Sequence, residues 1–250
     1  MSKFLVFSSV GDSTKNYWSW LKNNEKFDTA IVYYGNNEET WKLIKKNSTI
    51  SIRDSGYTFQ LLNKYFSLFD LHSQYLVVDD DLFMDLEEVF NTFIFMEKRK
   101  CPASSWSRNA ASHGFFDYAI TKNTKSIYNT NFIEQGHVFI AGDVLREFLV
   151  FCKMHDLDKI IVGWDILLTN FSIYKGLGDF KILDFYQYYN PHPNEKANGR
   201  EIDKGNNGFE ARSKPLKNFI DTNQHFFKML PNDYWGSTEM TQSIYIKPEN

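Results

Sequence analysis

The sequence predicts an α/β protein with a mixed, mainly parallel sheet flanked by helices and a smaller subregion in its second half. The chain has 250 residues, 42% hydrophobic and 24% charged, which suffices for a large buried core. Short apolar runs alternate with helical patterns through the first hundred residues. One run, the sequence YLVV at 75–78, stops at three consecutive aspartates, as a buried strand does where its carboxyl end opens onto a crevice.

The first part of the chain is expected to build parallel strands joined by helices. Apolar runs predict strands at 3–7, 29–34, 49–53 and 75–78. Helical spacing of apolar residues predicts helices at 16–24, 38–46, 57–69 and 86–98. Because strands and helices alternate, neighbouring strands are expected to run in the same direction.

The second part is less regular. Strands are expected at 115–121, 126–131, 136–140 and 180–189, and helices at 144–154, 165–174 and 216–230. The segment 190–215 has three glycines and no apolar periodicity, which predicts a long loop before a final helix and a polar tail. No linker divides the chain, so we expect a single domain over residues 1–250.

Charge and composition exclude several classes of protein. Lys and Arg total 28 against 31 Asp and Glu, a net charge of −3 without blocks of like charge, which argues against nucleic-acid binding through a broad basic face. Aromatic residues make up 17% of the chain. This excess has two interpretations that the sequence leaves open: codon bias from an AT-rich genome, or rings that stack on bases or sugars.

Cysteine usage and the apolar runs bear on the cellular compartment. Cys101 and Cys152 cannot form a disulfide scaffold, and we expect two buried thiols in a reducing compartment. The apolar run near the N-terminus has five residues, which is too short for a signal peptide, and no run approaches the roughly 18 residues of a membrane span. The expectation is a cytoplasmic protein without an integral membrane segment.

The three aspartates after the YLVV run are the strongest chemical signal. Adjacent carboxylates repel one another, so a cation or hydrogen-bond donors must offset their charge. Because strand side chains alternate, Asp79 and Asp81 are expected to face one side and Asp80 the other. Two such oxygen donors suit Mg²⁺ or Mn²⁺ bound together with a diphosphate. The alternative is an acidic turn before the helix at 86–98, for which Asp85 would serve as the N-cap.

The order of these motifs resembles the GT-A glycosyltransferases, which use nucleotide sugars and carry a DxD motif. The resemblance rests on FLVFSSVGD, TAIVYYG and YLVVDDDLFM and covers about residues 1–192. It implies a nucleotide-sugar-binding half at 1–100 and an acceptor-side half at 101–193. It also implies that Asp79 and Asp81 bind the metal. The residues implied at the nucleotide sugar are Ser8, Ser9, Gly11, Asp12, Arg53, Asp79 and Asp80.

A second signal is the run Gly163, Trp164 and Asp165 at the start of a predicted helix. It is similar to the turn of inverting GT-A enzymes that places an acidic residue beneath the acceptor. Inverting transfer needs a carboxylate to accept the proton of the attacking hydroxyl, and Asp165 is the candidate base. Asp is also a favoured N-cap, which is the alternative for Asp165. Trp164 either stacks on a sugar on the acceptor side or fills the core.

Two histidines and the long loop complete the candidate site. The resemblance implies that His192 is an additional metal ligand, although a histidine between prolines also suits a rigid surface turn. His113 is a candidate on the acceptor side. The segment 194–215 is a candidate lid whose basic residues meet the diphosphate, or else a surface insertion.

These observations predict a soluble glycosyltransferase dependent on Mn²⁺ or Mg²⁺. It would move a sugar from a UDP or GDP sugar, UDP being favoured, to a glycan, a protein-linked glycan or another hydroxyl acceptor, with inversion. The resemblance extends to soluble viral and bacterial enzymes, and a viral chain would act in the host cytoplasm. The alternatives are a sugar-phosphate nucleotidyltransferase and a non-catalytic sugar-binding module. The former would need a Gly-rich basic loop at 8–12, where the sequence has one glycine and no basic residue.

Overall fold

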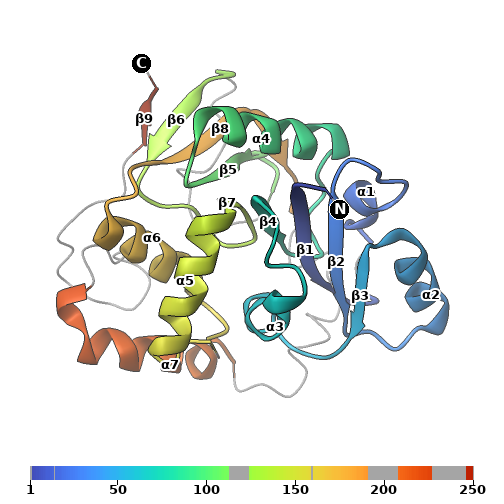
Figure 1. Ribbon diagram of the computed structural model, residues 1–250, viewed down its shortest axis with the longest axis horizontal. Helices are drawn as coiled ribbons and strands as arrows, with labels where there is room; N and C mark the ends of the chain where they lie inside the picture. The colour runs from blue at the N-terminus through green and yellow to red at the C-terminus, as the bar shows by residue number, and fades with distance from the viewer. Residues whose placement is uncertain are drawn as a thin grey trace.

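A computed structural model shows a nine-stranded mixed sheet with helices against both faces (Figure 1). The structure describes residues 2–13, 15–112, 124–158, 160–190, 208–226 and 246–249, with only the backbone described at 208–212, 224 and 246. The strand order is β3-β2-β1-β4-β7-β5-β8-β6-β9. The predicted α/β class is therefore confirmed.

The first four strands form the parallel part of the sheet. They are β1 (Phe4–Val10), β2 (Asp28–Tyr33), β3 (Ile50–Arg53) and β4 (Gln74–Val78). β1 lies between β2 and β4, so that Val6 is paired with Thr29 on one side and with Leu76 on the other. The carboxyl ends of these strands consequently share one edge of the sheet.

The direction of the strands changes beside β4. β7 (His137–Ala141) pairs with β4 in the antiparallel sense, and β5 (Ala103–Arg108) pairs antiparallel with β7. β8 (Phe180–Tyr188) runs parallel to β5, while β6 (Ile127–Thr130) is antiparallel to β8 and to β9 (Ile246–Pro248). Antiparallel pairs are thus as numerous as parallel ones among the described strands, and the sheet is evenly mixed rather than mainly parallel.

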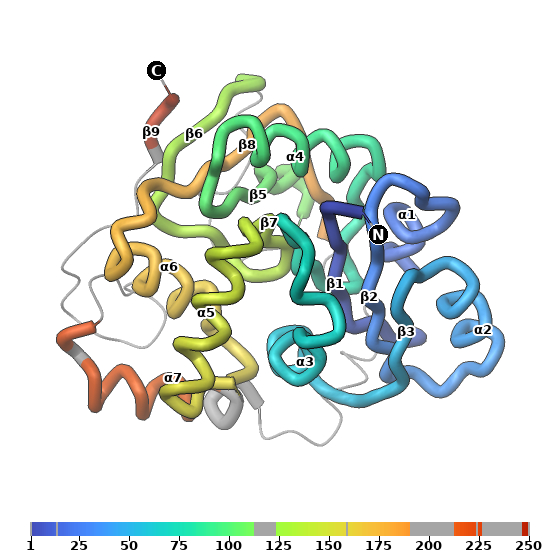
Figure 2. Tube along the Cα trace, in the orientation of Figure 1, coloured from blue at the N-terminus to red at the C-terminus, as the bar shows by residue number. Residues whose placement is uncertain are grey.

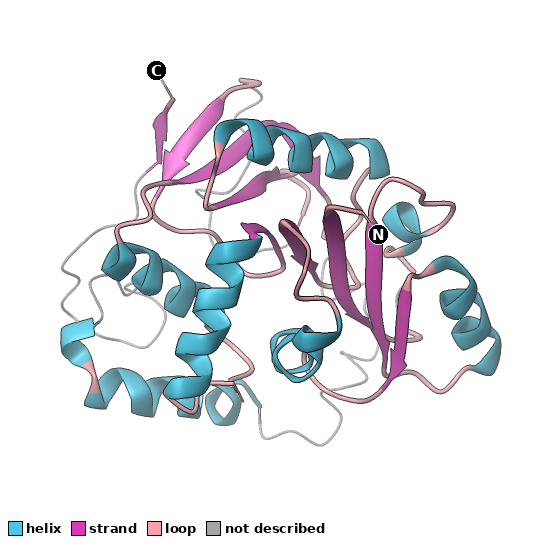
Figure 3. Ribbon diagram, in the orientation of Figure 1, coloured by secondary structure: helices cyan, strands magenta, loops and turns pink. Residues whose placement is uncertain are grey.

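Seven α-helices cover the sheet within the described ranges (Figure 3). They are α1 (Trp18–Leu21), α2 (Glu38–Asn47), α3 (Thr58–Tyr65), α4 (Leu86–Arg99), α5 (Gly142–Met154), α6 (Trp164–Lys175) and α7 (Gly208–Thr222). Along the tube in Figure 2, β1–β3 with α1 and α2 lie on one side of the molecule, and α5–α7 with β6 and β9 lie on the other.

Two hydrophobic clusters, one on each face of the sheet, explain the continuous apolar runs of β1 and β4. Leu5 and Phe7 of β1 pack with α3, α5 and α6, while Phe4 and Val6 pack with α1 and α4. In β4, Tyr75 and Val77 join the first cluster, and Leu76 and Val78 join the second. A strand buried on both faces gains apolar contacts from every residue. The two predicted free thiols, Cys101 and Cys152, are buried in these clusters.

The boundaries of several elements differ from the prediction. β5 was not predicted, because its sequence ASSWSR lacks an apolar run, yet all six residues are buried. The predicted strand at 115–121 lies outside the described residues. Residues 208–215 were predicted to belong to the loop and lid, but they are the first half of α7, which contains Pro215. The sequence pattern placed the helix start after this proline, whereas α7 accommodates it internally.

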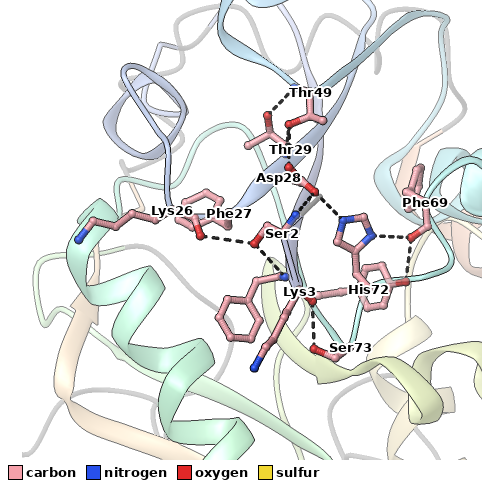
Figure 4. Close-up of polar contacts among 12 residues, drawn as sticks. Ser2, Lys3, Lys26, Phe27, Asp28, Thr29, Thr49, Phe69, His72 and Ser73 are labelled. Atoms are coloured by element: carbon pink, nitrogen blue, oxygen red, sulfur yellow. Dashed lines mark hydrogen bonds and ion pairs between the residues drawn. The ribbon is translucent and has the colours of Figure 1, made fainter.

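A polar network ties the amino ends of β1, β2 and β4 together, as Figure 4 shows. The Nε2 atom of His72 lies 3.0 Å from Oδ2 of Asp28, and its Nδ1 lies 3.0 Å from the carbonyl oxygen of Phe69. The same Asp28 oxygen accepts from the backbone N–H of Ser2 at 2.7 Å. His72 is buried, so it holds both partners in a region of low dielectric.

Replacing His72 by Ala is expected to destabilise the fold by about 2 kcal/mol, because the contacts of its buried ring nitrogens with Asp28 and with the carbonyl of Phe69 are lost. Leu71→Ala is the matched control, since Leu71 is 82% exposed and its truncation should cost less than about 0.5 kcal/mol. Urea denaturation of both variants measures the difference. Equal losses of stability would show that the His72 network contributes nothing.

Candidate carboxylate site

The three aspartates leave the sheet at its parallel-to-antiparallel boundary. β4 ends at Val78, and the backbone N–H of Asp79 donates to the carbonyl of Gly136, just before β7, at 2.7 Å. Asp80 and Asp81 then form a turn. The turn begins directly after the strand, so the alternation of strand side chains need not continue through Asp80 and Asp81.

Asp80 is held by donors from the two neighbouring strands. Its Oδ2 accepts from the backbone N–H of Gly11 at 3.0 Å and from the hydroxyl of Tyr34 at 2.8 Å. Gly11 follows β1 and Tyr34 follows β2, so both donors come from the same edge of the sheet as Asp80. Only 8% of Asp80 is exposed, and these bonds offset the cost of burying its charge.

Asp79 joins a chain of hydroxyl groups. Its Oδ1 accepts from Oγ1 of Thr58 at 3.0 Å, and Thr58 Oγ1 lies 2.9 Å from Oγ of Ser9. Thr58 is the first residue of α3, and Ser9 belongs to β1. The other nucleotide-site candidate on β1, Ser8, is fully buried, with its hydroxyl 3.5 Å from the carbonyl of Ser9.

Asp79 and Asp80 line one small pocket together. Its volume is about 20 Å³, enough for one water molecule or one ion. The remaining lining residues come from the ends of β1 and β2 and from the start of α3: Ser9, Tyr34, Gly56, Tyr57 and Thr58. Sequence patterns missed Tyr34 and Thr58. Tyr34 directly follows β2, and Thr58 is the first residue of α3.

Asp81 faces a different environment. It is 2% exposed, and its backbone carbonyl accepts from Nδ2 of Asn16 at 2.7 Å. The pKa of the Tyr188 hydroxyl is raised by burial and further by the charges of Glu134 and Asp81, against the opposing charge of Arg108. Asp81 thus lies in the electrostatic environment of β8, and it does not line the pocket of Asp79 and Asp80.

The pocket has the donor chemistry of a site for a hard cation. Two carboxylates and four hydroxyl-bearing side chains supply only oxygen, and Mg²⁺ in proteins often uses one or two carboxylates plus phosphates and water. Within the described ranges, no group of three or more His, Cys, Asp or Glu side chains is placed to hold a metal ion. Asp79 and Asp80 therefore fit a cation that a phosphate ligand helps to bind.

The alternative role of the aspartates as a helix cap is filled by another residue. The side chain of Asp85 accepts from the backbone N–H of Glu88 at 3.1 Å and caps α4. The run at 79–81 is therefore not needed to begin that helix.

Gly11 and Asp12 organise the loop after β1. A Cβ atom on Gly11 would lie 2.3 Å from the ring of Tyr34, so only glycine permits the contact between Tyr34 and Asp80. Oδ2 of Asp12 accepts from the backbone N–H groups of Asn36 and Asn37 at 2.7 and 3.1 Å. Asp12 therefore fixes the loop after β2 instead of lining the pocket.

Arg53 is engaged away from the pocket. It forms an ion pair of 2.6 Å with Glu38 and lies 5.7 Å from the ring centres of Tyr33 and Trp41. Arg53 is the last residue of β3 and lies near the sheet edge. Glu38, Tyr33 and Trp41 do not line the carboxylate pocket.

Asp165 is the second residue of α6 and is buried. It is 1% exposed, its Oδ2 accepts from the backbone N–H of Gln135 at 3.0 Å, and its Oδ1 accepts from that of Ile166 at 2.9 Å. Burial raises the pKa of the Asp165 carboxyl to about 6, although these N–H groups oppose the shift. Gln135 precedes Gly136, the partner of Asp79, so one short connection links Asp165 to the carboxylate pocket.

The other predicted residues are either buried or outside the described part. Trp164 is 5% exposed and stacks on Phe59 of α3 at 5.3 Å, so its ring is part of the core. His113 and His192 lie outside the described residues, as does the part of the predicted lid before residue 208.

His137 is a core histidine: burial lowers its pKa to about 3, and its Nε2 accepts from the backbone N–H of Trp106 at 3.1 Å.

A larger cavity lies elsewhere and has different chemistry. It measures about 570 Å³ between α5, α6 and α7, and aromatic side chains such as Phe151 and Phe219 dominate its lining. None of the candidate residues lines it.

Of the helices described, none combines the length and the apolar character required to cross a bilayer.

Comparisons with known proteins identify the fold. Residues 1–349 of S. aureus TarS in complex with UDP align with a TM-score of 0.52 at 13% identity, covering 90% of this chain and 73% of that chain. GalNAc-T7 with UDP, GalNAc and Mn²⁺ aligns with a TM-score of 0.55 at 10% identity, covering 76% of this chain and 44% of that one. A longer TarS structure gives 0.54 at 14% identity, with 44% of its length covered.

These neighbours are glycosyltransferases of the GT-A type. Their similarity to this chain confirms the predicted GT-A fold class. At these identities the likeness concerns the fold alone. No protein-family model matches the sequence, and no curated protein matches it.

Asp165 should make the stability of the protein depend on pH. Because its pKa is higher in the folded protein (about 6) than the ordinary value of 3.8, protonation favours the folded state. This contribution is fully present below pH 3.8, is lost as the pH rises through about 6, and amounts to about 3 kcal/mol. The difference in unfolding free energy between wild type and Asp165→Asn should therefore change between pH 4 and 7. A difference that is constant across this range would contradict the buried, titrating carboxyl.

Proposed function

We propose that this protein is a metal-dependent glycosyltransferase. It would transfer a sugar from a nucleotide diphosphate sugar, preferably a UDP sugar, to a hydroxyl of a glycan acceptor, with inversion at the anomeric carbon. The observation that carries the proposal is the pocket lined by Asp79 and Asp80 at the carboxyl ends of β1, β2 and β4. This is the edge at which open α/β sheets bind ligands, next to the boundary where the strand direction changes.

The pocket would receive the cation and the diphosphate rather than the whole nucleotide. Its volume of about 20 Å³ is far below the roughly 300 Å³ of a site that encloses a small organic ligand. The nucleoside would accordingly lie over the mouth of the pocket, beside the lining residues Tyr34 and Tyr57. The hydroxyls of Ser9 and Thr58 would orient its polar groups.

In the proposed reaction, Asp165 accepts the proton of the acceptor hydroxyl as the oxygen attacks the anomeric carbon. The bond from that carbon to the diphosphate oxygen breaks, and the nucleoside diphosphate leaves with its electron pair. A divalent cation held by Asp79 and Asp80 would supply positive charge to the departing diphosphate. A pKa of about 6 suits this base, because the carboxyl is ionised at neutral pH yet is more basic than an exposed aspartate.

Asp165 would have to become accessible to the acceptor. Its two oxygens accept from backbone N–H groups, and a carboxylate has about four lone-pair sites, so capacity for a further hydrogen bond remains. The connection around Gln135 covers one oxygen. Under this proposal, acceptor binding shifts that connection enough to expose the carboxylate.

Single Asp→Asn variants test the donor site. Asp79→Asn and Asp80→Asn should each weaken Mn²⁺-dependent binding of UDP by roughly 10-fold or more, because a charged oxygen ligand is lost. Asp85→Asn is the matched control, as it removes the same charge from the helix cap six residues beyond Asp79 and should leave affinity unchanged. Isothermal titration with UDP, with and without Mn²⁺, provides the measurement.

Asp81→Asn separates the two possible metal sites. If only this variant loses metal-dependent binding, the strand-alternation pairing of Asp79 with Asp81 governs the site, and the pocket does not. Unchanged UDP affinity in all three variants would overturn the proposed donor site.

Asp165→Asn tests the base. It should keep donor affinity but lower sugar transfer by roughly 10²-fold, the usual effect of removing a general base. In the wild type, kcat/KM should fall as the pH drops below about 6, because the base becomes protonated. Turnover of a sugar acceptor with UDP sugars over a pH series measures both effects. Full activity per folded molecule would leave Asp165 as a residue that only fixes the start of α6.

Product analysis distinguishes the alternatives. Release of UDP from UDP sugars supports a transferase, whereas pyrophosphate formation from a sugar phosphate and a nucleoside triphosphate would identify a nucleotidyltransferase. A sugar-binding module would bind sugars without either reaction.

A further inference from the structure

Gln135 bonds to the start of α6 through both its backbone and its side chain. Its backbone N–H donates to Oδ2 of Asp165 at 3.0 Å, and its side-chain Oε1 accepts from the backbone N–H of Gly163 at 3.1 Å. Gln135 lies on the connection between β6 and β7, far before both partners in the sequence. Two bonds of opposite direction therefore clamp this connection to the turn that carries the proposed base.

The amide of Gln135 has a specific task at this turn. α6 begins at a glycine N-cap, Gly163, which has no side chain with which to cap the first turn. Gly163 is buried, and its φ of +87° is a left-handed conformation that glycine adopts readily. A buried backbone N–H requires an acceptor, and the amide oxygen of Gln135 supplies one for Gly163.

The residue between these two partners is held by packing. Trp164 is 5% exposed, and its ring stacks on Phe59 of α3 at 5.3 Å. Core packing thus fixes the middle of the turn, while Gln135 bonds to the residue on each side. The place of the Asp165 carboxylate consequently depends on Gln135.

The bond from Gln135 also bears on the charge of Asp165. Burial raises the pKa of the Asp165 carboxyl, and the backbone N–H of Gln135 is the largest of the effects that lower it. Two further carboxylates belong to the adjoining segments. Glu134 precedes Gln135 and its charge acts on Tyr188 of β8, while Asp79 bonds to the same connection through its backbone N–H. A donor that bonds to a carboxylate favours the ionised form, which a general base needs.

We propose that Gln135 is a positioning residue that keeps the Asp165 carboxylate ionised and in place until an acceptor binds. The inference rests on the proposed function, in which Asp165 is the base and acceptor binding displaces the connection around Gln135. Displacement would remove a hydrogen-bond donor from the carboxylate, and so make it more basic as it receives the proton of the acceptor hydroxyl. Gln135 itself neither gives nor takes a proton.

Gln135→Met tests this role, because methionine is similar in length but its sulfur is only a weak acceptor for the N–H of Gly163. The first measurement needs no activity. The difference in unfolding free energy between Gln135→Met and the same variant carrying Asp165→Asn is followed from about pH 4 to 8. Its midpoint should lie about one pH unit above that of the wild-type background, because a hydrogen bond to a charged group is weakened.

Gln187→Met is the matched control. Gln187 is also half-buried, and its Oε1 accepts from Nδ2 of Asn109 at 3.1 Å, on β8. Its replacement removes an amide of the same kind and should leave the Asp165 midpoint where it is in the wild type. Gln135→Asn is a second test variant, since its shorter side chain withdraws the amide from Gly163, and it should raise the midpoint as Gln135→Met does.

Sugar transfer separates positioning from folding. UDP-glucose, UDP-galactose and UDP-N-acetylglucosamine with Mn²⁺ serve as donors, and methyl glycosides serve as acceptors. At a pH high enough to ionise Asp165 in every variant, Gln135→Met should lower kcat by roughly 10-fold and leave the KM for the donor unchanged. Gln135→Glu should retain most of this kcat, because a carboxylate oxygen still accepts from the N–H of Gly163.

Three results would overturn the proposal: an Asp165 midpoint that neither Gln135→Met nor Gln135→Asn raises, an equal rise in Gln187→Met, or a kcat that Gln135→Met leaves unchanged. The unfolding measurements contain no donor, so they decide the effect of Gln135 on Asp165 whatever the activity. Absence of transfer by the wild type from every UDP sugar would instead remove the proposed transferase.

Discussion

The position of β4 is the constraint on which the rest of the structure depends. This strand lies between a parallel neighbour, β1, and an antiparallel one, β7, and it is buried on both faces. Three aspartates follow this strand directly, so their charges lie at the border of an apolar interior and need hydrogen-bond partners. The ends of β1 and β2, the start of α3 and the residue before β7 all supply groups that bond to Asp79 or Asp80. The edge of the sheet is therefore organised around these carboxylates.

Each donor also restricts the residue that supplies it. Gly11 must lack a side chain because the ring of Tyr34 occupies the space beside it. The hydroxyl of Tyr33, the last residue of β2, donates to Asp12, and burial together with that bond raises the pKa of Tyr33 to about 12. A protonated Tyr33 keeps Asp12 in place, and Asp12 in turn fixes the loop after Tyr34. The sequence FSSVGD is consequently a structural support for the carboxylates as much as a candidate binding loop.

Sequence patterns predicted the first half of the fold well because its strands are apolar on both faces and its helices are amphipathic. The position of the aspartates followed directly from the end of the YLVV run. Their contacts were harder to predict, because alternation is a property of the strand and the chain turns at 80–81. Strand β5 escaped prediction for a related reason: its serines are buried by neighbouring strands, and burial of small polar residues leaves no trace in apolar periodicity. Tertiary context, rather than local preference, determines both features.

The connection between β6 and β7 contacts both Asp165 and the carboxylate pocket. The backbone N–H of Gln135 donates to Asp165, and the carbonyl of Gly136 accepts from the backbone N–H of Asp79. Gly136 has φ of +121°, a conformation that side-chain-bearing residues rarely adopt, although a Cβ there would meet nothing closer than 3.8 Å. The glycine is therefore required by the backbone path and not by crowding. Since that path sets the distance between Gln135 and Asp79, it also sets how the proposed base lies relative to the carboxylate pocket. A movement that uncovers Asp165 would pull on the residue next to the partner of Asp79, so acceptor access and donor binding would be coupled through a few backbone bonds.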